Sequence, residues 1–247
     1  MSGHNKFSKI KNKKAANDAA TGKIYTKIGR EIVVAVKEGG PDPNSNAKLK
    51  TVIAKARAAN MPNENINRSI KKATGELSSV NYEAMTYEGY GPAGSAVIVQ
   101  ALTDNKNRTA SEVRHLFDHH GGSLGSTNCV SYLFNKKGVL VIPKGVGVTE
   151  DDMMMHSIEA NAEDCVSYDT YYEIVTSPEN FDGARNYFET NNIPVDSAEV
   201  DLIPSSYITL DADKLKSFNR LIEELEDNDD VQEVYHNVDL PEDDEEE

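Results

Sequence analysis

Apolar residues recur with a helical period over roughly the first third of the chain. Ile24, Ile28 and Ile32 fall on one side of a helix, and a Gly-Gly pair follows that helix as a stop signal. Two more helices are predicted, one after the prolines of segment 41–43 and one between Pro62 and Gly75. The chain therefore opens with a helical module.

From residue 78 onward the apolar period changes from that of a helix to that of a strand. A capping box from Thr109 to Glu112 predicts the start of a further helix. Strands are predicted at 80–88, 95–103, 129–134, 138–143, 163–168, 171–176, 195–203 and 231–236, and the remaining helices at 150–160, 178–190 and 211–227.

The order of these elements predicts the fold class. Segment 135–206 has the strand-helix-strand-strand-helix-strand order of a ferredoxin-like unit. Segments 78–134 and 207–238 are each incomplete, but joined they make a second small unit. We therefore predict an α+β protein in which an N-terminal helical domain, 1–77, precedes two small α+β (ferredoxin-like) domains. The third domain is inserted into the second, and an acidic tail, 239–247, ends the chain.

Charge is divided unevenly between these parts. Residues 1–75 carry 16 Lys and Arg against 5 Asp and Glu, whereas the rest of the chain carries 10 against 36. Clustered Lys and Arg bind polyanions by displacing counterions from phosphates. The acidic remainder would repel the same polyanion. Binding of nucleic acid is therefore predicted for the helical module.

Candidate contacts lie on all three helices and on a lysine-rich arm ahead of them. Four basic side chains share one stripe of the first helix, opposite its isoleucines. We expect this stripe to be a solvated surface, so that changing it would leave the core untouched. The predicted nucleic-acid-binding residues are Lys6, Lys9, Lys11, Lys13, Lys14, Lys23, Lys27, Arg30, Lys37, Lys55, Arg57, Arg68, Lys71 and Lys72.

Three patterns resemble catalytic or metal sites, but their context does not favour those functions. Segment 89–94 fits the dinucleotide motif G-x-G-x-x-G, yet it joins two strands and so predicts a hairpin loop. Segment 121–125 fits G-x-S-x-G but leaves a helix, unlike a nucleophile elbow. Glu112, His115 and His119 share a helix face without further ligands. No enzymatic activity, metal or cofactor is predicted.

The remaining composition indicates where the protein works. Cys129 and Cys165 are too few for a disulfide framework, and with no signal segment they are expected to be reduced thiols. No apolar run approaches the ~18 residues that a membrane span needs. We expect a cytoplasmic protein with no membrane partner, either a monomer or a weak dimer.

Several motifs resemble those of YebC-type proteins. They are Gly3-His4-Asn5-Lys6-Phe7, Gly22-Lys23-Ile24-Tyr25-Thr26, Asn60-Met61-Pro62, Tyr87-Glu88-Gly89-Tyr90-Gly91-Pro92, and Thr103-Asp104-Asn105 followed by Asn107-Arg108-Thr109. The resemblance runs from end to end and is densest over 1–135. That family comprises bacterial proteins described as probable transcriptional regulators, together with the mitochondrial translational activator of cytochrome c oxidase. It implies a helical first domain and two α+β domains, with the third inserted into the second.

The sequence departs from the family pattern at a few positions. Asn128 and Asn161 stand where glycine is usual. Asn is the residue besides glycine that best tolerates a left-handed backbone, so we expect both turns to be retained. Phe7 replaces the usual Trp, which weakens any need for an indole contact there. Cys129 replaces the usual Ser, which argues against chemistry by that hydroxyl.

These observations predict a nucleic-acid-binding regulatory factor. The resemblance favours a DNA-binding transcriptional regulator. The alternative is a ribosome-associated translation factor that binds ribosomal RNA, because a lysine-rich helical face neutralises either phosphate backbone. The sequence shows no clear helix-turn-helix with Asn, Gln or Arg on a recognition helix, which mildly favours that alternative. A third hypothesis is a protein-interaction module with no affinity for nucleic acid.

Overall fold

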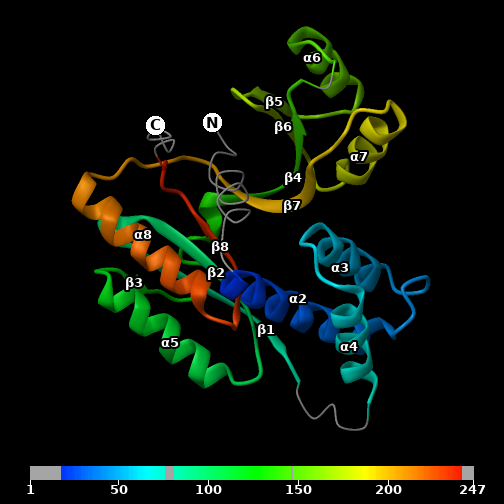
Figure 1. Ribbon diagram of the computed structural model, residues 1–247. Coiled ribbons are helices and arrows are strands. Elements are labelled where there is room, and N and C mark those ends of the chain that lie inside the picture. The colour runs from blue at the N-terminus through cyan, green and yellow to red at the C-terminus, as the bar shows by residue number, and fades with distance from the viewer. Residues whose placement is uncertain (1–17, 76–80, 146, 241–247) are drawn as a thin grey trace. The chain divides into compact units, whose positions relative to one another are not determined.

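The computed structural model describes residues 18–75, 81–145 and 147–240. The chain has an α+β fold, in which an N-terminal helical region is followed by two four-stranded antiparallel sheets (Figure 1). Contacts divide it into two compact units. The inserted unit is built on residues 132–207, and the main unit combines the described residues between 18 and 131 with residues 208–239. The boundary at residue 77 stays a prediction, since the main unit contains both the helical region and a sheet.

Three helices open the main unit, as the apolar period predicted. They are α2 (Asp18–Gly39), α3 (Ala47–Ala58) and α4 (Asn63–Thr74), and their buried faces share one core. Ile32 and Leu49 are fully buried there. Asn46 caps α3 by accepting a hydrogen bond from the Leu49 amide, and its own side-chain amide donates to the carbonyl of Ala35 in α2. This one side chain fixes the turn between the two helices.

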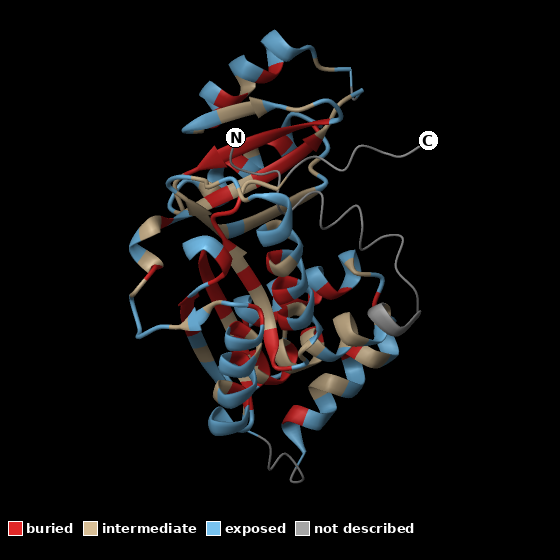
Figure 2. Cartoon of the chain, turned by 90° about the vertical axis from the view of Figure 1, so that its left-hand side faces the viewer, coloured by how far each residue is buried: buried red, intermediate tan, exposed pale blue. Residues whose placement is uncertain are grey.

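The sheet of the main unit has the strand order β3-β1-β2-β8. Its elements are β1 (Glu83–Tyr90), β2 (Ala96–Thr103), α5 (Lys106–His119), β3 (Ser123–Leu124), α8 (Ala212–Asp227) and β8 (Val231–His236). Helices α5 and α8 contact each other and the sheet. Figure 2 shows the resulting contrast between buried residues of the sheet and exposed outer faces of the helices. Strand β8 follows the inserted unit in the sequence, so the sheet of the main unit is made from segments on both sides of that unit.

The inserted unit is ferredoxin-like. Its elements are β4 (Phe134–Pro143), α6 (Glu150–Glu159), β5 (Asp164–Ser167), β6 (Tyr171–Thr176), α7 (Phe181–Thr190) and β7 (Ser197–Pro204). The strand order β5-β6-β4-β7 is the order that this connectivity predicts. Helix α7 begins three residues later than expected, because the Ser177 hydroxyl accepts a hydrogen bond from the Asn180 amide and forms a turn ahead of it.

The strand predicted at 129–134 begins only at Phe134. The residues before it form a loop that ends in a short 3-10 helix, η2 (Ser131–Leu133), and this loop is held by the buried carboxylate of Glu88. The amides of Asn128, Val130 and Ser131 donate to that carboxylate at 2.8, 3.0 and 2.8 Å. Burial alone would raise the pKa of Glu88, but these backbone hydrogen bonds outweigh burial and lower it. These amides thus donate to a carboxylate that is distant in sequence, and not to a neighbouring strand as predicted.

The capping box predicted at Thr109 is also wrong. Helix α5 begins at Lys106, and the side chain of Asn105 caps it by accepting from the Arg108 amide at 3.1 Å. Thr109 lies one turn inside the helix and is fully buried. Its hydroxyl donates to Oδ2 of Asp230 at 2.6 Å. A tertiary contact therefore uses the hydroxyl that was assigned to the cap.

The glycine-rich segment 89–94 contains the last two residues of β1 and the hairpin turn that leads into β2, so the hairpin is confirmed. A Cβ at Gly89 would lie 2.6 Å from the carbonyl oxygen of Ser123, so a side chain there would separate β1 from β3. Asn128 and Asn161 have φ of 65° and 53°, which confirms both expected left-handed turns. No helix within the described ranges is long and apolar enough to cross a membrane.

Candidate nucleic-acid interface

The basic stripe of α2 contacts the end of α8 and the turn that follows it. Lys23 forms an ion pair with Asp227 at 2.9 Å. Lys27 donates to the carbonyl oxygen of Glu226 at 2.6 Å, where the negative end of the α8 dipole lies. These contacts join the helical region to the sheet of the main unit.

The expectation of a solvated stripe is wrong for Arg30. Its guanidinium, 15% exposed, forms an ion pair with Asp230 and donates to the carbonyl oxygen of Leu102 at 3.0 Å. Lys37, at the far end of the stripe, is exposed and donates to Asn81 at 2.7 Å. The acidic partners come from residues 226–230, about two hundred positions away, so no local pattern could show them. The role of these four residues in nucleic-acid binding stays a prediction.

Asp230 is the centre of this contact. Its side chain is 4% exposed. Arg108 and Thr109 each donate to its Oδ2 at 2.6 Å, and Thr103 does so at 3.1 Å. Burial alone would raise the pKa of Asp230, but the hydrogen bonds from Thr109, Arg108 and Arg30 outweigh burial and lower the pKa to about 2. One charged carboxylate therefore joins α2, α5 and the end of β2.

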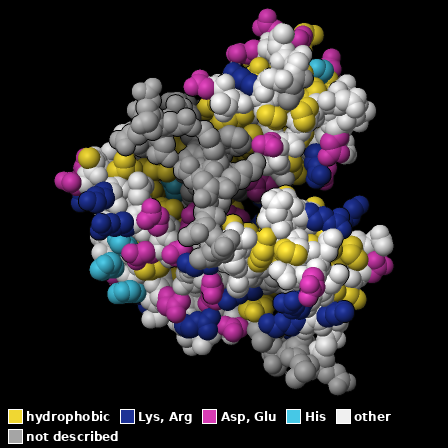
Figure 3. Space-filling model, in the orientation of Figure 1, with side chains coloured by type: hydrophobic (Ala, Val, Ile, Leu, Met, Phe, Trp, Pro, Cys, Tyr) yellow, Lys and Arg dark blue, Asp and Glu magenta, His cyan; other side chains and the backbone are white. Residues whose placement is uncertain are grey.

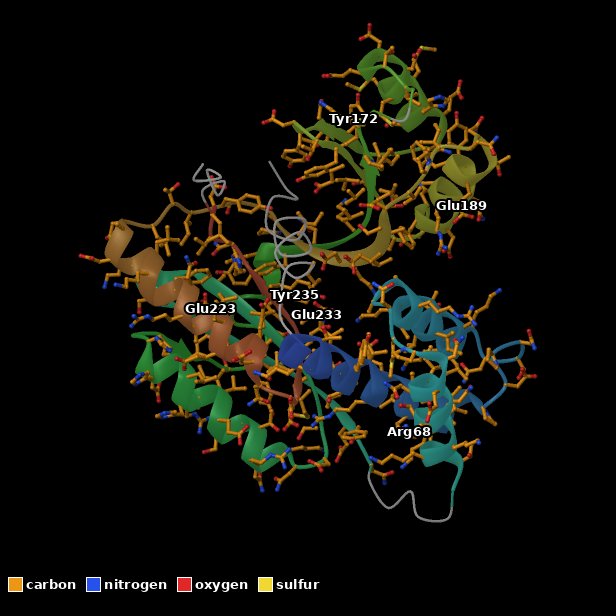
Figure 4. All side chains as sticks on the ribbon, in the orientation of Figure 1. Arg68, Tyr172, Glu189, Glu223, Glu233 and Tyr235 are labelled. Atoms are coloured by element: carbon orange, nitrogen blue, oxygen red, sulfur yellow. The ribbon has the colours of Figure 1, made fainter. Side chains whose placement is uncertain are left out.

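Helix α3 carries basic residues on two flanks that differ in their surroundings. Lys48 and Lys55 lie on the flank that meets α2. Lys48 pairs with Glu38 at 2.6 Å, and Lys55 pairs with Glu31 at 2.8 Å. Glu233 of β8, labelled in Figure 4, lies 3.4 Å from Lys55 as well. These charges are compensated inside the molecule.

The opposite flank of α3 carries Lys50 and Arg57, seven residues apart and so on the same side of the helix. Both are exposed, and neither forms an ion pair with another described residue. Lys71 and Lys72 of α4 share both properties. Lys and Arg side chains are accordingly visible over the α3–α4 part of the chain in Figure 3. Among the described residues, uncompensated cationic charge of the helical region is concentrated on α3 and α4.

Helices α3 and α4 are joined by residues 59–62 and run in clearly different directions in Figure 1. Asn60 has a positive φ of 58°, and the Tyr25 hydroxyl donates to its carbonyl oxygen at 2.7 Å. Two helices joined by a turn of this length have the connectivity of a helix-turn-helix. The sequence predicted both helices, but not that an Asn side chain would be exposed beside Arg68 on the second one.

The outer face of α4 carries the residue types that read bases. Asn67 and Arg68 are exposed there, with Lys71 one turn further along. Figure 4 labels Arg68 on this helix. Arg68 forms an ion pair with Glu64 at 3.1 Å, and both side chains are well exposed, so the pair contributes little to stability. This guanidinium can exchange its partner at low cost.

Other predicted site features fare differently. Lys6, Lys9, Lys11, Lys13 and Lys14 lie outside the described residues. The rings of His115 and His119 are stacked with centroids 5.8 Å apart. Within the ranges that the structure describes, no group of three His, Cys, Asp or Glu side chains is arranged to hold a metal ion.

Comparison with known proteins places the chain in a family. A family model described as the N-terminal domain of TACO1/YebC proteins matches residues 5–76, and one for their second and third domains matches 82–238. The chain belongs to the TACO1/YebC family. A "Probable transcriptional regulatory protein" of Acetivibrio thermocellus is 58% identical over 238 residues, covering 96% of this chain and 98% of the relative. One of Thermoanaerobacter pseudethanolicus is 49% identical over 246 residues and covers both chains fully.

A solved structure agrees with this assignment. The crystal structure of a conserved hypothetical protein from Aquifex aeolicus has a TM-score of 0.81 and 42% sequence identity, and the match covers 94% of this chain and 96% of that one. Two motifs that carried the TACO1/YebC resemblance have structural roles here. Glu88 holds the loop ahead of β4, and Thr103, Arg108 and Thr109 hold Asp230.

Asp230→Ala is expected to destabilise the main unit strongly. The change leaves the largely buried guanidinium of Arg30 without its ion-pair partner, and losing one partner of a buried ion pair costs about 3 to 5 kcal/mol. Urea denaturation measures the free energy of unfolding. Asp229→Ala is the matched control, because Asp229 is exposed and adjacent in sequence. Equal effects of the two changes would contradict the assigned role of Asp230.

Acid should weaken the same contact. The pKa of Asp230 is about 2 in the folded chain, below the ordinary value near 3.9 of an unfolded chain. The stabilisation is therefore complete above about pH 5 and is lost as the pH falls towards 2. Between those pH values the parent should lose about 2 kcal/mol more unfolding free energy than the Asp230→Ala variant. Parallel losses in both proteins would show that Asp230 is not responsible.

Proposed function

We propose that this TACO1/YebC-family protein is a regulatory factor of transcription that binds double-stranded DNA through α3 and α4. The exposed face of α4 carries the proposal, because it presents Asn67, Arg68 and Lys71 on the second helix of a helix-turn-helix. In such motifs the second helix enters the major groove and its N-terminal residues reach the base edges. The names of the relatives, "Probable transcriptional regulatory protein", support the same conclusion.

The roles of the individual side chains follow from their chemistry. Arg pairs with two acceptors of guanine and Asn with the edge of adenine, so we assign base contacts to Arg68 and Asn67. Lys50, Arg57 and Lys71 are assigned to phosphates, which position a protein on the duplex without reading its sequence. Lys72 and the lysines of segment 6–14 are proposed as further phosphate contacts.

The α2 stripe receives a different role in this proposal. Lys23, Lys27 and Arg30 contact residues 226–230, and Lys55 contacts acidic residues of α2 and β8. Using them on DNA would mean giving up these contacts. We therefore propose that they orient the helix-turn-helix on the main unit, and that α3 and α4 provide the DNA-binding surface.

Reversing the charge of α4 should abolish most DNA binding. The variant Arg68→Glu/Lys71→Glu/Lys72→Glu removes three cationic groups from the proposed surface and leaves the helix core intact. The affinity for a duplex should fall at least about 30-fold at physiological salt, because three phosphate or base contacts are lost. Fluorescence anisotropy with a labelled duplex measures the loss.

The matched control is the variant Lys214→Glu/Lys216→Glu/Arg220→Glu on α8. It changes the net charge of the protein by the same amount, at exposed positions of another helix in the main unit. It should bind DNA within about threefold of the parent, since screening weakens distant charges. An equal loss in both variants would show that only overall charge matters.

Cosedimentation of the protein with ribosomal subunits that survives deoxyribonuclease would instead favour ribosomal RNA as the target.

Salt should weaken the complex steeply. If Lys50, Arg57, Lys71 and Lys72 and one lysine of segment 6–14 each neutralise a phosphate, the logarithm of affinity falls with the logarithm of salt at a slope near −4 to −5 for duplex DNA. The α4 variant should show a clearly shallower slope in the same titration. A salt-independent affinity of the parent would contradict binding through phosphates.

A further inference from the structure

The inserted unit carries an apolar ridge on the outer face of α6. Met154, Met155 and Ile158 are 48%, 62% and 70% exposed. They are half of the six large hydrophobic residues that are exposed in the described part of the chain, and all three lie within a helix of 10 residues. Figure 2 shows buried and exposed residues on the two sides of this helix, the uppermost in the view.

The spacing of these residues places them together. Ile158 follows Met155 by three positions and Met154 by four, so the three side chains are neighbours on the helix surface. Met153 and Ser157, on the other side, are buried and hold α6 on the sheet. The Thr149 hydroxyl accepts from the Asp152 amide and caps the helix. The ridge therefore has no part in holding α6 in place.

The surroundings of the ridge are acidic. Residues 132–207 contain 4 Lys and Arg against 14 Asp and Glu, a net charge of −10. Asp151 lies one turn before Met154 and Met155 on the same face, and Asp152 and Glu159 flank it. Asp and Glu side chains are visible at several places over the upper part of Figure 3, where the inserted unit lies. An anionic surface of this kind repels nucleic acid and attracts cationic groups.

We propose that the α6 ridge is a docking surface for a basic segment of a partner protein, an amphipathic helix with apolar anchors among Lys and Arg. The apolar side chains would supply burial, and the acidic rim would select and orient a cationic partner. Methionine side chains suit such a surface because they are flexible and polarizable. The same ridge of a second copy is disfavoured as the occupant, because residues 132–207 of that copy would bring the same net charge of −10.

The test is binding of a fluorescein-labelled helical peptide of Leu and Lys, with its leucines on one face, to the full chain. The variant Met154→Ser/Met155→Ser/Ile158→Ser should weaken binding at least about tenfold, because three exposed anchors are removed. The control Tyr132→Ser/Val200→Ser removes exposed apolar side chains elsewhere in the same unit and should stay within about twofold of the parent.

Asp151→Lys keeps the apolar side chains of the ridge and reverses the nearest charge. It should therefore lower the affinity for the same peptide about threefold or more. Unchanged binding by both the serine variant and Asp151→Lys would overturn the proposal. Equal binding of a peptide with Ser in place of every Leu would also overturn it, since charge alone would then explain the affinity. A concentration-dependent dimer of the parent that the serine variant abolishes, seen by sedimentation velocity, would identify a second copy as the occupant instead.

The proposal is independent of DNA binding through α4. The serine variant of α6 should bind duplex DNA as the parent does, and the α4 charge variant should bind the peptide as the parent does. Either protein failing in both assays would show a general loss of structure, which circular dichroism of the variants measures directly.

Discussion

A buried carboxylate cannot remain charged without compensation, and Asp230 obtains its compensation from three distant parts of the chain. Arg30 comes from α2, Arg108 and Thr109 come from α5, and Thr103 comes from the end of β2. The position of the helical region on the sheet follows from this requirement. The turn that carries Asp230 lies between α8 and β8, so residues from the two ends of the sequence must meet there.

This contact also decides which cationic groups remain available. Lys23, Lys27 and Arg30 have the spacing of a binding stripe, yet they compensate the acidic end of α8 and the turn after it. Lys55 likewise forms ion pairs inside the molecule, with Glu31 of α2 and Glu233 of β8. Among the described residues of the helical region, the basic charge that remains uncompensated lies on the outer flank of α3 and on α4. A count of lysines and arginines would not separate these two groups, because their chemistry is the same and only their neighbours differ.

Local patterns predicted the elements well and the tertiary contacts poorly, for physical reasons. The isoleucines of α2 and the strand order of the inserted unit follow from periodicity and connectivity, which are local. Thr109 fits a capping box, but its hydroxyl binds Asp230, which is 121 residues away. Segment 129–133 fits a strand, but the amides of Val130 and Ser131 donate to the carboxylate of Glu88. At the candidate site the sequence predicted the basic helices themselves. It could not predict that Asp230, 200 residues away, compensates the charge of Arg30.

The central claim is that α3 and α4 provide the DNA-binding surface while the α2 stripe holds the helical region in place. Chemical modification of lysine side chains, followed residue by residue by mass spectrometry with and without duplex DNA, tests both halves at once. The account predicts that Lys50, Lys71 and Lys72 react more slowly once DNA is bound, and that Lys27 reacts slowly in both states. Protection of Lys23, Lys27 and Lys37 by DNA, with Lys71 and Lys72 unchanged, would contradict it.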